Sequence, residues 1–175
     1  MLSTILSKSD CAECKFCCSF KRTSLWETPV FEKALVEKLK SLFPHVKFVP
    51  VSASSSSFTY DISMNYKTSD PAEEAPCPFL DRHRGCMLPP QDKPFDCKIW
   101  PLRAVKLPAD AAKPPRLAVA LTPTCPAINR QPLQKVRELA QNGLGKTILD
   151  YAAKNPDIIK EYSEFLSTIV FSEDL

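Results

Sequence analysis

The sequence predicts an α+β fold with a small sheet, an irregular proline-rich middle and a C-terminal helical cap. Three observations support this prediction. Apolar residues recur at helical spacing near both ends, and apolar and polar residues alternate from Phe58 to Tyr66. Thirteen of the seventeen prolines lie between Pro71 and Pro132. Because proline fixes φ and lacks a backbone donor, this middle stretch suits neither a long helix nor a central strand.

The first part of the chain predicts one helix followed by two strands. Thr28-Pro29 is typical of a helix start, with an N-cap residue and then proline at the first helical position. Pro44 ends this helix, whose apolar face would be Phe31, Leu35, Leu39 and Leu42. We then expect a short strand over 46–51, a serine-rich turn or loop over 52–57, and a half-buried strand over 58–66.

The last part predicts one more strand and then three helices. The strand covers 117–121, and the first helix covers 133–142 and is closed by Gly143. A second helix follows over about 144–154. A third starts at Asn155-Pro156 and continues to about Ile169. We expect one domain over 1–175, with a cysteine-cluster core at 11–125 and the helical cap at 129–175.

Composition points to an ordinary soluble protein, with 44% apolar and 25% charged residues. The net charge is +3 and both signs are interleaved, so there is no strong nucleic-acid or membrane signal. Met1 to Asp10 lacks the apolar stretch of a signal peptide, and no segment approaches transmembrane length. We therefore expect a cytoplasmic protein, whose thiols stay reduced and favour metal binding over disulfides.

The cysteines are the strongest chemical signal. A C-x2-C-x2-C spacing lets one short loop wrap three corners of a cubane iron–sulfur cluster, whereas zinc sites more often use two separated pairs. We expect Cys11, Cys14 and Cys17 to share a centre with one distant cysteine, and the adjacent Cys18 to point elsewhere. All eight cysteines are predicted metal ligands: Cys11, Cys14, Cys17, Cys18, Cys77, Cys86, Cys97 and Cys125. Bound metal would then organise the proline-rich middle.

Other polar residues near the thiols have simpler interpretations. We expect His83 to be an exposed turn residue and His45 to face solvent near a helix end. Asp81, Asp92 and Asp96 are interpreted as turn residues. The basic side chains could balance thiolate charge or meet an acidic partner, but a solvated face is the simplest interpretation for Lys15, Lys21, Arg22, Arg82, Arg84, Lys98 and Arg103.

The central cysteines lie in distinctive motifs, namely Cys77-Pro78-Phe79-Leu80, Gly85-Cys86 and a Cys97 that Trp100-Pro101 follows. Together with the N-terminal run, these motifs resemble the CxxCxxCC cysteine-cluster family of zinc- or iron-chelating proteins, over about residues 11–125. The chain departs from the family pattern at Lys15, where many members have glycine, and at Lys93, where arginine is usual. The family also includes a much longer flagellin lysine methylase.

Three functions follow from these motifs and this resemblance. The first is a thiolate-ligated iron–sulfur cluster, of the 4Fe-4S type, with a redox or electron-transfer role and an unknown protein or redox partner. The second is a zinc-stapled protein- or RNA-binding module, with zinc as the alternative or second metal. The third is a peptide side-chain modifying enzyme related to flagellin lysine methylase. The sequence contains no phosphate-binding glycine loop and no recognisable nucleophile–base pair.

Overall fold

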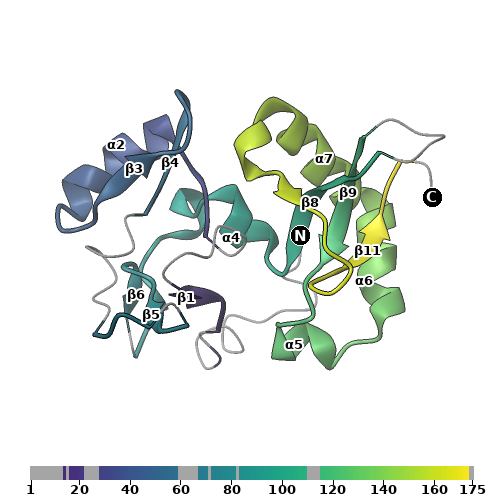
Figure 1. Ribbon diagram of the computed structural model, residues 1–175, viewed down its shortest axis with the longest axis horizontal. Helices are drawn as coiled ribbons and strands as arrows, with labels where there is room; N and C mark the ends of the chain where they lie inside the picture. Colours follow the sequence, from purple (N-terminus) through teal and green to yellow (C-terminus); the bar gives the residue numbers. More distant parts are fainter. Residues whose placement is uncertain are drawn as a thin grey trace. The chain divides into compact units, whose positions relative to one another are not determined.

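The computed structural model describes most of the chain, namely residues 14, 16–21, 28–58, 67–70, 72–81, 83–109 and 115–173. The described elements belong to two compact units, Ala12–Lys98 and Ile99–Leu175 (Figure 1). Helices and small sheets occur together, which confirms the predicted α+β class. Cys11 and most of the expected strand over 58–66 lie outside the described residues. None of the helices described here is long and apolar enough to cross a membrane.

The unit Ala12–Lys98 is built from short elements. Its helical segments are η2 (Phe16–Cys18), α2 (Lys33–Leu42), η3 (Pro90–Asp92) and α4 (Phe95–Ile99). Its strands are β1 (Ser19–Lys21), β2 (Phe31–Glu32), β3 (Phe48–Pro50), β4 (Ser55–Phe58), β5 (Glu74–Pro76), β6 (Leu80–Asp81) and β7 (Gly85–Cys86). These strands form the antiparallel sheets β1-β5, β2-β4-β3 and β6-β7.

An aromatic cluster forms the core of this unit. Phe79 is 1% exposed, and its ring centre lies 5.0 Å from that of Phe43 and 6.0 Å from that of Phe31. Phe31 also packs edge-on against Phe48 at 5.4 Å. Such edge-to-face contacts add to the stabilisation from burial alone. The cluster's other buried side chains are Phe20, Val36, Leu39, Val46, Ala75 and Leu88.

The expected helix start at Thr28 is wrong. Helix α2 begins at Lys33, with Glu32 in the N-cap position, and Thr28 is buried at 3% exposure. Phe31 belongs to β2, where it pairs with Ser56 of β4, because this pairing directs its ring into the core. Leu39 is buried as expected, whereas Leu42 is 59% exposed.

The expected strand over 46–51 is confirmed as β3. The expected turn over 52–57 is confirmed only in its first part, because β4 begins at Ser55. Strand β4 then pairs with β3 in the register Val49↔Ser57 and Pro50↔Ser56.

The unit Ile99–Leu175 contains one larger sheet with helices. Its strands are β8 (Leu102–Leu107), β9 (Arg116–Leu121), β10 (Lys160–Glu161) and β11 (Thr168–Phe171). Its helical segments are α5 (Pro126–Asn129), α6 (Leu133–Leu139), the π-helical turn η4 (Ala140–Leu144), α7 (Gly145–Lys154) and η5 (Pro156–Ile158). The sheet order is β10-β8-β9-β11, with β10 parallel to β8 and the other pairs antiparallel. Helix α7 packs against β8 and β9 (Figure 1).

Two of the expected C-terminal helices are confirmed, as α6 and α7, and the third is wrong. Gly143 adopts a φ of +103° between α6 and α7, as expected of a residue that closes a helix. Residues 155–171 form η5, β10 and β11 in place of a third helix. Their backbone pairs with β8 and β9, the two central strands of the sheet, as in Lys160↔Val105 and Ile169↔Ala120. The expected cap at 129–175 therefore mixes helices with the sheet's two edge strands.

Candidate metal centre

The sheet β1-β5 brings the N-terminal cysteine run beside the central segment. Phe20 pairs with Ala75 and Ser19 with Pro76 in the antiparallel register. One step further, the backbone N–H of Cys77 donates a hydrogen bond to the carbonyl of Cys18 at 2.6 Å. Backbone pairing therefore brings Cys18, and with it the end of the N-terminal cysteine run, beside Cys77.

A tight turn directs the thiol of Cys77. The backbone N–H of Leu80 donates to the carbonyl of Cys77 at 2.9 Å, and the N–H of Phe79 donates to the Cys77 thiol group. Hydrogen bonds of this kind favour the thiolate, which is the form that ligates metals. The Phe79 ring lies at the centre of the aromatic core and so anchors the turn. The role of Phe79 as the anchor of this turn was not predicted, although Phe79 is part of the C-P-F-L motif.

A hairpin formed by the two-residue strands β6 and β7 carries Cys86. Strands β6 and β7 pair in the register Leu80↔Cys86 and Asp81↔Gly85, with Gly85 at a φ of +80°. The carboxylate of Asp81 accepts hydrogen bonds from the backbone N–H groups of His83 at 2.8 Å and Arg84 at 2.7 Å. The Arg84 and His83 N–H groups lower the pKa of Asp81. Asp81 is the last residue of β6 and its carboxylate holds the turn that follows, so it is not itself a turn residue as expected. His83, in this turn, is exposed, as the sequence predicted.

Cys97 lies on α4 and follows a buried carboxylate. Its backbone N–H donates to the carbonyl of Pro94 at 3.0 Å. The preceding Asp96 is 1% exposed, and its Oδ2 accepts a hydrogen bond from the backbone N–H of Val30 at 2.9 Å. Asp96 lies in α4, so its interpretation as a turn residue is wrong. It binds the segment before β2 to the helix that carries Cys97.

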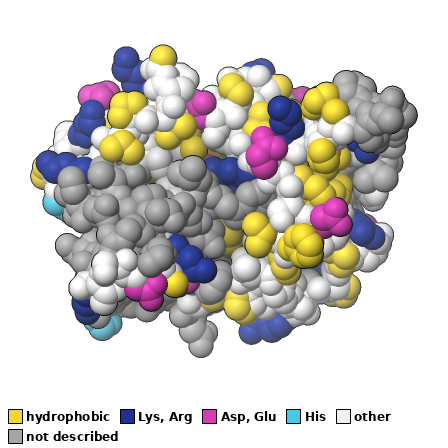
Figure 2. Space-filling view, viewed as in Figure 1, with side chains coloured by type: hydrophobic (Ala, Val, Ile, Leu, Met, Phe, Trp, Pro, Cys, Tyr) yellow, Lys and Arg dark blue, Asp and Glu magenta, His cyan; other side chains and the backbone are white. Residues whose placement is uncertain are grey.

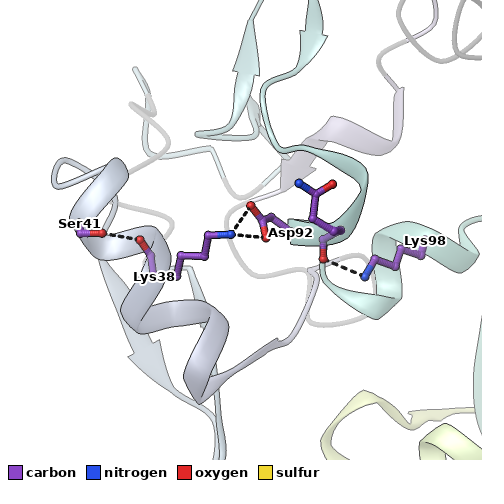
Figure 3. Close-up of polar contacts among 5 residues, drawn as sticks. Lys38, Ser41, Asp92 and Lys98 are labelled. Carbon is purple, nitrogen blue, oxygen red and sulfur yellow. Dashed lines mark hydrogen bonds and ion pairs between the residues drawn. The ribbon is translucent and has the colours of Figure 1, made fainter.

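A second carboxylate holds the chain just before α4. Asp92 is 8% exposed, and both its oxygens lie 2.7 Å from Nζ of Lys38 on α2 (Figure 3). On the other side of η3, Nζ of Lys98 donates to the carbonyl of Gln91 at 3.2 Å (Figure 3). Asp92 does belong to a 3₁₀ turn, but its partner on α2 could not be inferred from local sequence. Together these contacts hold the chain in place just before α4, the helix that carries Cys97.

The electrostatics of Cys77 show which thiols are its neighbours. Burial is the largest cause of a pKa well above the ordinary thiol value. The Phe79 N–H acts in the opposite direction, while charges at Cys97, Cys86 and Cys17 raise the pKa further. Three thiols are therefore close enough for their charge to act on the fourth. All four belong to the unit Ala12–Lys98.

The other cysteines have different environments. Cys14 is exposed, and Cys18 is half-buried and joined to Cys77 through its backbone. Cys125 is half-buried at the N-cap of α5, in the unit Ile99–Leu175. Among the described cysteines of the N-terminal run, Cys17 is the one whose charge raises the pKa of Cys77.

The four thiols fit a metal in ligand type and number. Within the described ranges, no three His, Cys, Asp or Glu side chains already stand in the arrangement of a metal site. A set of four sulfur ligands nevertheless suits zinc or an iron–sulfur cluster, and both use four cysteines in proteins. A positive metal ion at this position would also stabilise the Cys77 thiolate, which burial and the neighbouring thiols disfavour. The fit therefore rests on the chemistry of the donor set.

The basic residues differ in how far they are exposed to solvent. Lys21 and Arg84 are exposed as expected, and Lys98 is half-exposed. Arg103 is 2% exposed, and its guanidinium carbon lies 4.3 Å from the centre of the Trp100 ring, so its assignment to a solvated face is wrong. The apolar residues around it in β8 were the signal for burial on both faces. On the face that Figure 2 shows, lysine and arginine side chains are scattered among acidic and apolar ones.

Comparison of the chain with family models, with curated proteins and with solved structures finds no match. The resemblance to the CxxCxxCC cysteine-cluster family therefore stays a prediction.

Proposed function

We propose that the unit Ala12–Lys98 carries a thiolate-ligated metal centre, with Cys17, Cys77, Cys86 and Cys97 as its ligands. What supports this proposal best is that Cys17, Cys86 and Cys97, from three other segments, are near enough for their charges to raise the pKa of Cys77. Thiols that serve only as small core residues have no reason to lie near one another. A reducing compartment, the cytoplasm, is the setting in which these thiols stay available for metal.

An iron–sulfur cluster with a redox or electron-transfer role is the occupant that we propose first. Iron–sulfur clusters are held by four cysteine thiolates, which is the type and number of ligand proposed here. The Phe79 N–H directed at the Cys77 thiol adds support, because hydrogen bonds to cluster sulfurs help to set reduction potentials. Cys14, three residues before Cys17 in the sequence, is exposed and is either a further candidate ligand or a spare thiol.

Zinc is the second candidate, and the shortness of the strands favours it. The strands that carry or precede Cys77 and Cys86 are two or three residues long. Sheets of this size are marginal by themselves. A structural zinc bound by four thiolates supplies folding free energy to such a region. The protein would then be a zinc-stapled binding module. The enzymatic alternative stays a prediction.

Metal and sulfide analysis tests these proposals. The full chain is purified without oxygen, and iron, zinc and acid-labile sulfide are measured per chain. Iron with matching sulfide supports the cluster, whereas zinc without sulfide overturns the cluster in favour of the stapled module. No metal in a folded protein overturns both.

Matched serine variants test the ligand assignment. Cys77→Ser and Cys86→Ser are expected to lose the metal, while Cys125→Ser, in the other unit, is expected to keep it. Circular dichroism checks that each variant is folded. Loss of the same metal in Cys125→Ser alone would show that the ligand set is a different one.

A further inference from the structure

The β1-β5 pair places two cysteines opposite each other. Its register continues one step beyond Ser19↔Pro76, where the backbone N–H of Cys77 donates to the carbonyl of Cys18 at 2.6 Å. In an antiparallel pair, opposite residues at such a hydrogen-bonded position have Cα atoms about 5.5 Å apart. A disulfide spans Cα separations of about 4.4 to 6.8 Å. The backbone of Cys18 and Cys77 therefore already has the spacing that a disulfide needs.

The pleat of the two strands directs both cysteine side chains to one face. Side chains two residues apart on a strand share a face, so Cys18 shares one with Phe20, and Cys77 shares one with Ala75. Phe20 and Ala75 are each 3% exposed and belong to the core of the unit, and Cys77 packs against the same core. Cys18 and Cys77 are both half-buried. The two side chains therefore share the border of the core, where solvent still reaches them.

We propose that oxidation by a peroxide joins Cys18 to Cys77 in a reversible disulfide. One thiolate attacks an oxygen of hydrogen peroxide, the O–O bond breaks, and the thiolate becomes a sulfenic acid as water leaves. The second thiol then attacks the sulfenic sulfur, the S–S bond forms, and a second water leaves. The two thiols lose two electrons in total, and the peroxide takes them up.

The same register makes this disulfide easy to reduce. At a hydrogen-bonded position the Cβ atoms of opposite residues are about 5.5 Å apart, whereas a relaxed disulfide needs about 3.5 to 4.5 Å. Closing the bond therefore requires the strands to shift, and a strained disulfide is reduced more readily. Strands β1 and β5 have three residues each, so little pairing opposes this shift. The pair is thus suited to a reversible modification.

Oxidation of this pair also competes with metal binding, and this consequence rests on the proposed function, in which Cys77 is a ligand. The thiolate is the form of cysteine that ligates metals, and a disulfide removes it. The oxidised chain is left with Cys17, Cys86 and Cys97 as ligands. The disulfide itself needs no metal, so it is tested separately.

Mass spectrometry of the oxidised chain tests the disulfide. The metal-free full chain is treated with stoichiometric hydrogen peroxide, and the remaining thiols are alkylated before digestion with trypsin. Cleavage after lysine and arginine gives peptide 16–21, with Cys17 and Cys18, and peptide 68–82, with Cys77 as its only cysteine. We expect these two peptides to be linked, and excess glutathione to release them. A different disulfide in place of this link, oxidised thiols without any link, or a link that resists glutathione would overturn the proposal.

Serine variants identify the partner of Cys77. Cys17→Ser is the matched control and should form the link at an unchanged rate, whereas Cys18→Ser should not form it. In Cys17→Ser the only thiol of peptide 16–21 is Cys18, so this variant assigns the link even where Cys18→Ser does not fold. Loss of the link in Cys17→Ser, or its formation at an unchanged rate in a folded Cys18→Ser, would overturn the assignment.

Zinc binding tests the competition with metal. The reduced chain is expected to bind stoichiometric zinc, and the oxidised chain is expected to lose most of it and to recover it after reduction. Equal zinc in both forms would overturn the competition. Absence of zinc from the reduced chain would instead overturn the four-thiol centre, while the mapped disulfide would still support the pairing of Cys18 with Cys77.

Discussion

The carboxylate of Asp96 accepts a hydrogen bond from the backbone N–H of Val30 at 2.9 Å, and this contact joins two segments that lie 66 residues apart in the sequence. Asp96 is 1% exposed and Val30 is 8% exposed, so water cannot easily replace the bond. Because Cys97 follows Asp96, the contact also determines where one proposed ligand lies.

Removal of this carboxylate should destabilise the protein. We expect Asp96→Ala to lower the free energy of unfolding by about 2 kcal/mol, because the buried Val30 N–H loses its acceptor. Asp96→Asn keeps an acceptor oxygen and should cost less. Urea denaturation measures both values. Asp150→Ala removes the exposed ion pair with Lys146 and serves as control, with an expected loss of about 0.5 kcal/mol or less. Equal losses at Asp96 and Asp150 would contradict the proposed role of the Val30 contact.

Truncation of Phe79 should affect both the core and the centre. Phe79→Ala removes a ring that contacts several aromatic neighbours, and we expect a loss of about 3 kcal/mol or more. Phe79→Leu keeps most of the buried volume and the backbone N–H, so it should retain metal. Thermal unfolding and metal content are measured together. Phe165→Ala, at a side chain that is 97% exposed, should change neither.

The hairpin that carries Cys86 should be sensitive to acid. The Arg84 and His83 N–H groups lower the pKa of Asp81 in the folded protein. A carboxylate with a depressed pKa stabilises the fold above its unfolded pKa of about 3.9, and this stabilisation is lost as the pH falls through the folded value. An NMR titration should place the Asp81 midpoint below that of an unstructured aspartate. An unshifted midpoint would show that these hydrogen bonds do not form in solution.

Two glycines in the unit Ile99–Leu175 should respond differently to alanine. Gly143 has a φ of +103° with no atom within 4 Å of an added Cβ, so Gly143→Ala should cost about 1 kcal/mol from backbone strain alone. A Cβ at Gly145 would collide with the Phe171 ring and lie 2.9 Å from the carbonyl oxygen of Ala140. Gly145→Ala should therefore cost about 2 kcal/mol or more. Thermal unfolding ranks the two, and the opposite order would contradict the close packing of α7 on β11.

Metal removal should act on one unit only. Chelation of the metal-loaded chain should increase amide hydrogen exchange in the segments around Cys77, Cys86 and Cys97, because ligand binding stabilises the state that holds it. The segments of β8, β9 and α7 belong to the other unit and should exchange at unchanged rates. Equal acceleration throughout the chain would show that the metal's stabilisation is not confined to Ala12–Lys98.

The local sequence was sufficient for elements whose signals are local. Periodicity predicted α2, α6 and α7, and the strands β3 and β9 were expected at nearly their observed positions. Gly143 ends a helix as expected, because few other residues adopt its left-handed backbone conformation at low cost. The cysteine types and spacings identified the candidate ligands, since ligand chemistry depends on residue type.

Tertiary structure decided the features that depend on distant partners. The apolar residues after Asn155 would suit a helix. The outer edges of the β8-β9 pair, however, offer backbone hydrogen bonds, and the segment forms β10 and β11 there. Asp96 can be buried because it accepts a hydrogen bond from the Val30 N–H. Val30 lies 66 residues away, so the sequence around Asp96 does not indicate this partner. The β1-β5 register, set by pairing across more than fifty residues, brings Cys17 to the central thiols. The sequence by itself therefore determined which side chains are candidate metal ligands, and long-range backbone pairing decided which parts of the chain that carry them lie near one another.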